Sequence, residues 1–176
     1  EQSALGGLST YAKTKQEALE LARQSSQRVA NVIMSNHESP LRGAEFVSGK
    51  IARGVAAIAR GSASTIELGD LTVQRDWSFA GDIVHGMVKV MDRQFTGDVI
   101  LASGVTRPLR DLVAAAFAAV EIHEWPQYVH HSADLVRSEA SLRRFDVSRA
   151  RGSLGWSADT PLEQWMADMV NFHLAH

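Results

Sequence analysis

The chain has no cysteine, no glycine-rich phosphate-binding turn and no long apolar run. Without cysteine, a disulfide-stabilised scaffold and thiolate chemistry are excluded, and the composition suits a reducing cytoplasm. No apolar stretch approaches the roughly 20 residues that a membrane-spanning helix requires. These absences lead us to expect a cytoplasmic protein that makes no use of a membrane.

An excess of charge of either sign is also missing. Lysine and arginine number 18, aspartate and glutamate number 20, and the formal net charge is −2. Such a balance gives no electrostatic basis for binding nucleic acid or an anionic membrane, so neither is expected as a partner.

His130 and His131 would point to opposite faces of a strand, and no further ligand stands at metal-binding spacing. We therefore expect no metal site.

What is present is enough for one globular domain: 176 residues, of which 45% are apolar. Strand-like and helix-like patterns alternate along the chain, which indicates an α/β fold. Asp70–Trp77 is predicted to be a loop with at most a short strand. Thr160, Pro161 and Glu163 together resemble an N-cap, a first-turn proline and a capping box. The pattern predicts helices over 10–28, 46–59, 80–90, 108–120 and from 161 onward, and strands over 29–35, 65–69, 99–102 and 127–131.

The segment Asn36–Gly43, with the sequence NHESPLRG, carries the strongest signal. It follows an apolar run, Val29–Met34, that is predicted to be a buried strand, and it precedes a helical pattern. In α/β proteins, ligands bind outside the carboxyl ends of the strands. The polar residues of this segment are therefore the first candidates for a ligand site. Surface ion pairs and solvated side chains remain the alternative for each of them.

Tyr11 and Lys15 form a second candidate pair. They are four residues apart near the start of a predicted helix, so both side chains lie on one face. A free phenol has a pKa near ~10, and a nearby cation favours the phenolate, which can then act as a base. The spacing is common, and a pair on a helix surface is the alternative.

Taken together, several segments resemble the GDP-mannose 4,6-dehydratases, a family of the extended short-chain dehydrogenase/reductase superfamily. Tyr11 and Lys15 lie just upstream of a strand and its polar end, as in that superfamily. The resemblance runs in register over nearly the whole chain. The segments that carry it are Asn36–Gly43, Phe46–Ile51, Leu68–Leu71, Arg75–Trp77, Ile100–Gly104 and Leu154–Trp156.

This resemblance implies the C-terminal part of a Rossmann-like enzyme, joined to its nucleotide-sugar-binding subdomain. The implied reaction is the NADP-dependent dehydration of GDP-mannose to GDP-4-keto-6-deoxymannose, with NAD as the alternative cofactor. The implied assembly is a homodimer or homotetramer. Two other functions stay open: an epimerase, reductase or dehydratase acting on another nucleotide sugar, or a non-catalytic nucleotide-sugar-binding half-protein.

The resemblance also implies roles for individual residues. Tyr11 would be the catalytic base on the sugar 4-hydroxyl, and Lys15 its helper and a ligand of the cofactor ribose. His37 and Arg42 match positions that contact the cofactor. The positions that match residues binding the GDP part are Asn36, Lys50, Arg75, Arg137 and Glu139.

The chain departs from the family pattern in several places. Leu41 and Gly49 each replace a family arginine. The family's Gly-x-Gly-x-x-Gly turn is absent, and its upstream threonine and glutamate cannot be located. We therefore expect the 176-residue chain to be the C-terminal half of a longer polypeptide, and to be inactive on its own.

Overall fold

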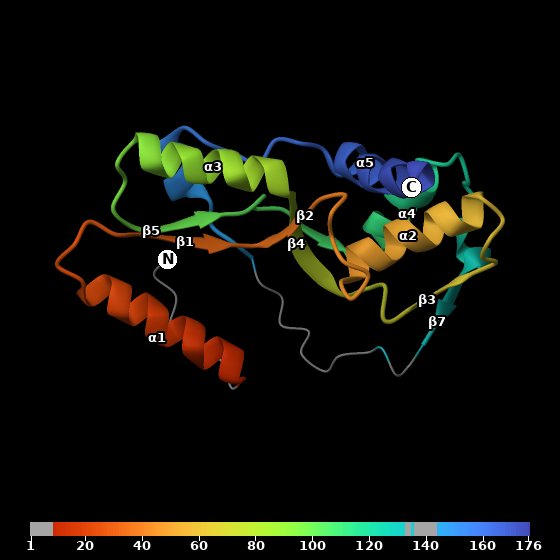
Figure 1. Ribbon diagram of the computed structural model, residues 1–176, viewed down its shortest axis with the longest axis horizontal. Coiled ribbons are helices and arrows are strands. Elements are labelled where there is room, and N and C mark those ends of the chain that lie inside the picture. Colours follow the sequence, from red (N-terminus) through yellow and green to blue (C-terminus); the bar gives the residue numbers. More distant parts are fainter. Residues whose placement is uncertain (1–8, 133–134, 136–143) are drawn as a thin grey trace.

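The computed structural model describes residues 9–132, 135 and 144–176. Helices and strands alternate, as the sequence predicts, and the fold is α/β (Figure 1). The helices are α1 (Thr10–Gln24), α2 (Val47–Ala59), α3 (Ala80–Asp92), α4 (Leu109–Ala118) and α5 (Leu162–Ala175), with a 3₁₀ helix, η1 (Trp125–Tyr128), and a π-helix, η3 (Ala150–Leu154). The strands are β1 (Ala30–Met34), β2 (Asn36–Glu38), β3 (Ile66–Leu68), β4 (Gln74–Phe79), β5 (Gly97–Leu101), β6 (Thr106–Pro108) and β7 (Val129–His131).

The strands of the described residues form three small sheets. β1 pairs in parallel with β5, and β3 pairs in parallel with β7. The third sheet has the order β2–β4–β6, with β2 parallel and β6 antiparallel to β4. Only Ser35 separates β1 from β2, so one continuous segment joins the first sheet to the third.

The strand predicted over Val29–Ser35 exists, but it is half-buried and not buried as expected. Met34, at its end, is 38% exposed. Within the described part of the chain β1 pairs only with β5, and α1 beside it has no buried residue. Parallel strands are usually covered on both faces, so this sheet has less cover here than is typical of its kind.

The larger core lies between α2, α4 and α5. Its central side chains include Ile51, Phe117 and Trp165, all essentially inaccessible to solvent. A second cluster packs α3 on β5 and η3 through Ile83, Leu101 and other side chains. All four tryptophans pack in or against these two clusters, as expected from the sequence. No helix among the described residues is long and apolar enough to cross a membrane.

Local structure differs from the prediction in three places. Asn36–Glu38 is a strand where a loop was expected. The short strand allowed within Asp70–Trp77 is longer than expected and extends to Phe79, because β2 and β4 pair with each other across the sequence. Helix α5 has Pro161, not Thr160, as its N-cap residue, and no side chain caps it. The Thr160 backbone N–H and hydroxyl instead donate to the Asp82 carboxylate of α3, at 3.0 and 2.9 Å. Thr160 therefore links two helices and leaves the helix end uncapped.

Asp76 of β4 connects this strand to the turn between β5 and β6. Its carboxylate is buried, at 2% exposure, and accepts the Ser103 N–H at 3.0 Å and the Ser103 hydroxyl at 2.9 Å. The Gly104 N–H donates to its other oxygen at 2.8 Å. Gly104 has a φ of +75°, in the left-handed region that favours glycine. Asp76 thus satisfies a turn whose backbone groups would otherwise lack partners.

We expect Asp76→Ala to lower the free energy of unfolding by roughly 3 kcal/mol, because it leaves the N–H groups of the half-buried Ser103–Gly104 turn without their charged acceptor. Urea denaturation of the purified protein measures this change. Asp168→Ala, at an exposed position of α5, is the matched control and should change stability by less than about 0.5 kcal/mol. Similar stabilities for the two variants would contradict the role given to Asp76.

His173 of α5 is a buried side chain with an unsatisfied nitrogen. The residue is 8% exposed, and its Nε2 atom has no hydrogen-bond partner among the described residues. Burial lowers the pKa of His173 below its ordinary value, and the charges of Arg53, His176 and Arg60 lower it further. The folded protein therefore favours the neutral imidazole.

Because the folded pKa lies below the ordinary value of 6.5, the unfolded chain binds protons more readily as the pH falls. Neutral His173 therefore contributes fully to the free energy of unfolding above about pH 6.5, and this contribution is lost as the pH falls through the lowered pKa. We expect His173→Met to reduce the loss of stability between about pH 7.5 and about pH 5.5. Urea denaturation at both pH values checks this, and the exposed His85→Gln should behave like the unsubstituted protein.

Candidate functional site

The β2–β4–β6 sheet brings together candidate residues that are far apart in sequence. Asn36 of β2 is in register with Trp77 of β4, and His37 with Ser78. Arg75 of β4 lies directly opposite Arg107 of β6. The predicted ligands Asn36, His37 and Arg75 therefore lie on neighbouring strands, where the chain leaves the carboxyl end of β1. Arg107 was not among the predicted site residues, because its proximity to Arg75 arises only from strand pairing.

Backbone contacts fix the start of this region. His37 Nδ1 lies 2.9 Å from the Ser35 carbonyl oxygen. A carbonyl oxygen only accepts, so Nδ1 carries the proton in this contact. The hydroxyls of Ser35 and Ser78 lie 3.2 Å apart and hydrogen-bond across the two strands. His37 is thus held by Ser35, the residue that joins β1 to β2.

Glu38 belongs to this region although it was not among the predicted site residues. It does not pair with His37. Its buried carboxylate accepts a hydrogen bond from the Ser48 hydroxyl, and Arg42 Nε lies 3.2 Å from its Oε2 atom. The Arg42 guanidinium carbon also lies 3.6 Å from the centroid of the Phe46 ring. The spacing of four residues between Glu38 and Arg42 was the available signal in the sequence.

The other predicted nucleotide ligands differ in exposure, and two of them are not described. Asn36 is exposed, and Lys50 is half-buried in the early part of α2. Arg75 is half-buried, and its Nη1 donates to the Gln74 carbonyl oxygen at 2.8 Å. Arg137 and Glu139 lie outside the described residues.

Tyr11 and Lys15 occupy the start of α1. The Ser9 hydroxyl accepts the Ala12 N–H at 3.1 Å and caps this helix. Tyr11 is 73% exposed, and Lys15 Nζ lies 5.7 Å from the centroid of its ring, so the predicted pair is adjacent. In the described part of the chain, no hydrogen bond or ion pair links either residue to the region around β2.

The direction of α1 sets the place of this pair. Arg23, near the end of α1, forms an ion pair with Asp98 near the start of β5. The helix then leads into β1, which runs back along it, so its opposite end lies toward the carboxyl ends of β1 and β5 (Figure 1). Tyr11 and Lys15, in the first turns of α1, therefore lie toward the carboxyl end of β1, where the chain continues into β2.

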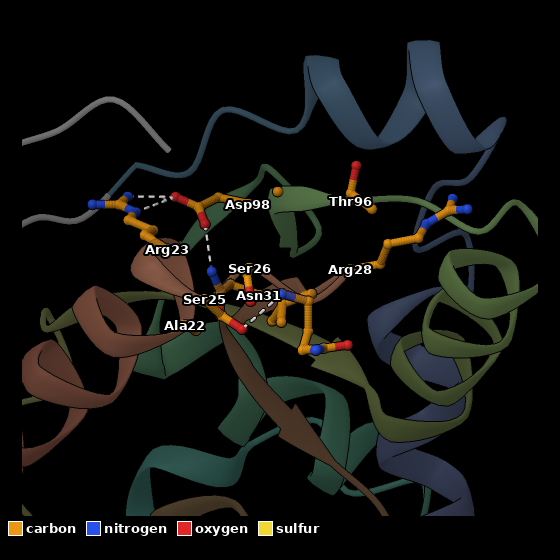
Figure 2. A pocket seen from close by; sticks show the side chains of 11 residues that line it. Ala22, Arg23, Ser25, Ser26, Arg28, Asn31, Thr96 and Asp98 are labelled. Atoms are coloured by element: carbon orange, nitrogen blue, oxygen red, sulfur yellow. Dashed lines mark hydrogen bonds and ion pairs between the residues drawn. The ribbon is translucent and has the colours of Figure 1, made fainter.

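A polar pocket of about 430 Å³ lies at the other end of these strands. Figure 2 shows Arg23 and Asn31 both bonded to the Asp98 carboxylate at its wall. Burial alone would raise the pKa of Asp98. Hydrogen bonds from Arg23 and Asn31 and the charges of Arg23 and Arg149 outweigh burial and hold the pKa below its usual range. None of the predicted site residues lines this pocket, and its polar network serves to attach α1 to the sheet.

Metal-binding groups do not gather in the residues that the structure describes. No three histidine or carboxylate side chains lie close enough together there to hold an ion. His130 and His131 of β7 are both exposed. The arrangement around β2 instead offers cations and polar groups suited to an anionic ligand.

Comparison with known proteins gives consistent results. The profile of the GDP-mannose 4,6 dehydratase family matches residues 1–169. The GDP-mannose 4,6-dehydratase of Sinorhizobium fredii (strain HH103) is 34% identical over 170 residues, covering 84% of this chain and 47% of that protein. The GDP-mannose 4,6 dehydratase of Drosophila melanogaster is 32% identical over 157 residues, covering 80% of this chain and 40% of that protein. The chain thus spans about half the length of these relatives, or somewhat less.

Solved structures share the fold at lower identity. RMD from Pseudomonas aeruginosa, complexed with NADPH, has a TM-score of 0.84 and 21% identity, with 94% of this chain and 55% of that chain covered. The dTDP-glucose 4,6-dehydratase of Bacillus anthracis, in complex with NAD, has a TM-score of 0.82 and 14% identity, with 100% and 55% covered. These likenesses show that this chain has the same fold as the matched parts of those two proteins. The family match extends over almost the entire sequence and agrees with that fold, and the chain therefore belongs to the GDP-mannose 4,6 dehydratase family.

Proposed function

We propose that this chain provides the nucleotide-sugar-binding part of an enzyme that dehydrates GDP-mannose to GDP-4-keto-6-deoxymannose. The observation that carries the proposal is the family match over residues 1–169 together with the gathering of Asn36, His37 and Arg75 on paired strands. Polar and cationic groups on neighbouring strands suit a nucleoside diphosphate sugar, because arginine binds its pyrophosphate through charge-assisted hydrogen bonds.

In this proposal the residues have the roles that the family resemblance implies. Tyr11 takes the proton from the sugar 4-hydroxyl, and Lys15 favours the phenolate and binds the cofactor ribose. His37 and Arg42 contact the cofactor. The residues that bind the GDP part are Asn36, Lys50, Arg75, Arg137 and Glu139.

The cofactor is a nicotinamide dinucleotide, with NADP preferred over NAD. It supplies hydride transfer when bound, and the chain's own residues orient the sugar and move the proton at its 4-hydroxyl. RMD from Pseudomonas aeruginosa is complexed with NADPH, and MoeE5 is in complex with UDP-glucuronic acid and NAD. These proteins of the same fold support a site that takes a dinucleotide and a nucleotide sugar together.

A complete cofactor site requires groups that are not in this sequence. The Gly-x-Gly-x-x-Gly turn is absent from it, and the chain spans about half the length of its relatives. We propose that the remaining groups come from a further stretch of the same polypeptide, and that the complete protein is a cytoplasmic homodimer or homotetramer.

The proposed activity is tested on the protein as its gene encodes it. Incubation with GDP-mannose and NADP⁺ should yield a nucleotide sugar that has lost one water, detected by mass spectrometry. Parallel reactions with UDP- and dTDP-sugars test specificity. Turnover of one of these, with GDP-mannose left unchanged, would assign the protein to another nucleotide-sugar reaction.

Tyr11→Phe should lower the rate of GDP-mannose dehydration by roughly 100-fold or more, because it removes the proton acceptor for the sugar hydroxyl. Affinity for GDP, measured by titration calorimetry, should not change. Tyr128→Phe is the matched control, since this half-buried ring stacks on Phe117 in the core. An active Tyr11→Phe variant would rule out Tyr11 as the base.

Arg75→Gln should weaken GDP binding by about tenfold, the usual effect of losing a hydrogen bond to a charged group. Arg151→Gln, at an exposed position of η3, removes the same charge away from the proposed site and should bind GDP normally. Thermal denaturation of both variants separates loss of binding from loss of folding. Equal GDP affinity in the two variants would exclude Arg75 as a nucleotide ligand.

A further inference from the structure

The loop between β2 and α2 is built around a buried carboxylate. Glu38 is 2% exposed and Ser48 is 1% exposed, and the Ser48 hydroxyl donates to Glu38 Oε2. Burying a carboxylate is costly unless polar partners compensate for the lost water. The second partner of Glu38 is the guanidinium group of Arg42, four residues further on.

Arg42 is held on two sides by this arrangement. Its Nε atom lies 3.2 Å from Glu38 Oε2, and its guanidinium carbon lies 3.6 Å from the centroid of the Phe46 ring. The Nε atom is buried and has no aligned hydrogen bond among the described residues, so its contact with Glu38 is coulombic. The Glu38 carboxylate therefore contacts the Nε edge of the guanidinium group, and the Phe46 ring packs against one of its faces.

The backbone under Arg42 is also tightly packed. A Cβ atom at Gly49 of α2 would lie 2.3 Å from the Gly43 carbonyl oxygen and 2.7 Å from the Arg42 carbonyl oxygen. These distances are too short for any side chain, so the loop rests directly on the helix backbone. The family arginine that Gly49 replaces would not fit this arrangement, and the loop sits close to α2 because the residue is glycine.

The terminal nitrogens of Arg42 remain available. Within the described part of the chain, neither Nη1 nor Nη2 makes a hydrogen bond or an ion pair, and the side chain is 24% exposed. Arginine presents its donors in a rigid planar fork that matches the oxygens of a phosphate group. Glu38 and Phe46 hold the Arg42 guanidinium in place, and its Nη1 and Nη2 atoms can bind such an anion.

We propose that Glu38 is a positioning residue that acts through Arg42. It holds the guanidinium so that Nη1 and Nη2 bind a phosphate group of the nicotinamide dinucleotide. Ser48 and Gly49 support it by fixing the carboxylate and the loop backbone. The inference rests on the proposed function in one respect, that the dinucleotide binds beside this loop.

The test compares NADPH and GDP binding in the protein as its gene encodes it. Glu38→Gln keeps the shape and an acceptor for the Ser48 hydroxyl but removes the charge that faces Arg42. We expect NADPH to bind roughly tenfold more weakly and GDP to bind unchanged. Glu45→Gln, at an exposed position of the same loop, is the matched control and should bind both ligands normally.

A double-mutant cycle shows whether Glu38 acts through Arg42. Arg42→Ala should weaken NADPH binding, and adding Glu38→Gln should then have no further effect. An equal loss in both backgrounds, or normal NADPH affinity in Glu38→Gln, would overturn the inference. If Glu38→Gln does not fold, Arg42→Lys provides the test, because it keeps the charge and loses the fork. Normal NADPH affinity in that variant would be equally contradictory.

A measurement without cofactor separates this inference from the proposed function. In nuclear magnetic resonance spectra of the unligated protein, Glu38→Gln should shift the Arg42 Nε resonance, because it removes the charge that lies 3.2 Å from that atom. An Arg42 Nε resonance that Glu38→Gln leaves in place would overturn the positioning role. Failure of the unsubstituted protein to bind NADPH would contradict the proposed function and the phosphate part of this inference, while a shifted resonance in Glu38→Gln would still support the hold of Glu38 on Arg42.

Discussion

The pairing of β2 with β4 is the contact on which the rest of the candidate site depends. It brings Asn36 and His37 beside the strand that carries Arg75, although about forty residues separate them. Because only Ser35 lies between β1 and β2, the same pairing sets where the chain leaves the β1–β5 sheet. It also sets the start of the loop that carries Arg42. Without the pairing of β2 with β4, Asn36 and His37 would not lie beside Arg75.

Three carboxylates of low exposure stabilise the connections around this ladder. Glu38 joins β2 to the loop and to α2, Asp76 joins β4 to the turn after β5, and Asp98 joins β5 to α1. Each has hydrogen-bond donors as partners, as the burial of an ionised group requires. Polar contacts require particular partners, whereas apolar contacts are not directional. The three carboxylates therefore help to specify which segments pair.

The family resemblance was readable from the sequence because NHESPLRG and the segments after it occur in order over almost the whole chain. Helices α2 and α3 and strand β3 were predictable from local periodicity, which reflects which face of each element is buried. Strands β2 and β4 were not fully predicted, because they are short, polar and held by pairing with distant residues. Thr160 was misread as a helix cap, since its true partner, Asp82, is far away in the sequence.

The sequence by itself determined the fold class, the family and the residue types that make up the proposed site. These properties depend on local pattern and on the order of motifs, both of which are written along the chain. Only the tertiary structure decided that Glu38 faces Arg42, that Arg107 lies opposite Arg75, and that β1 is half-buried. Contacts of this kind arise from strand register and side-chain burial, which depend on packing between segments and not on neighbouring residues.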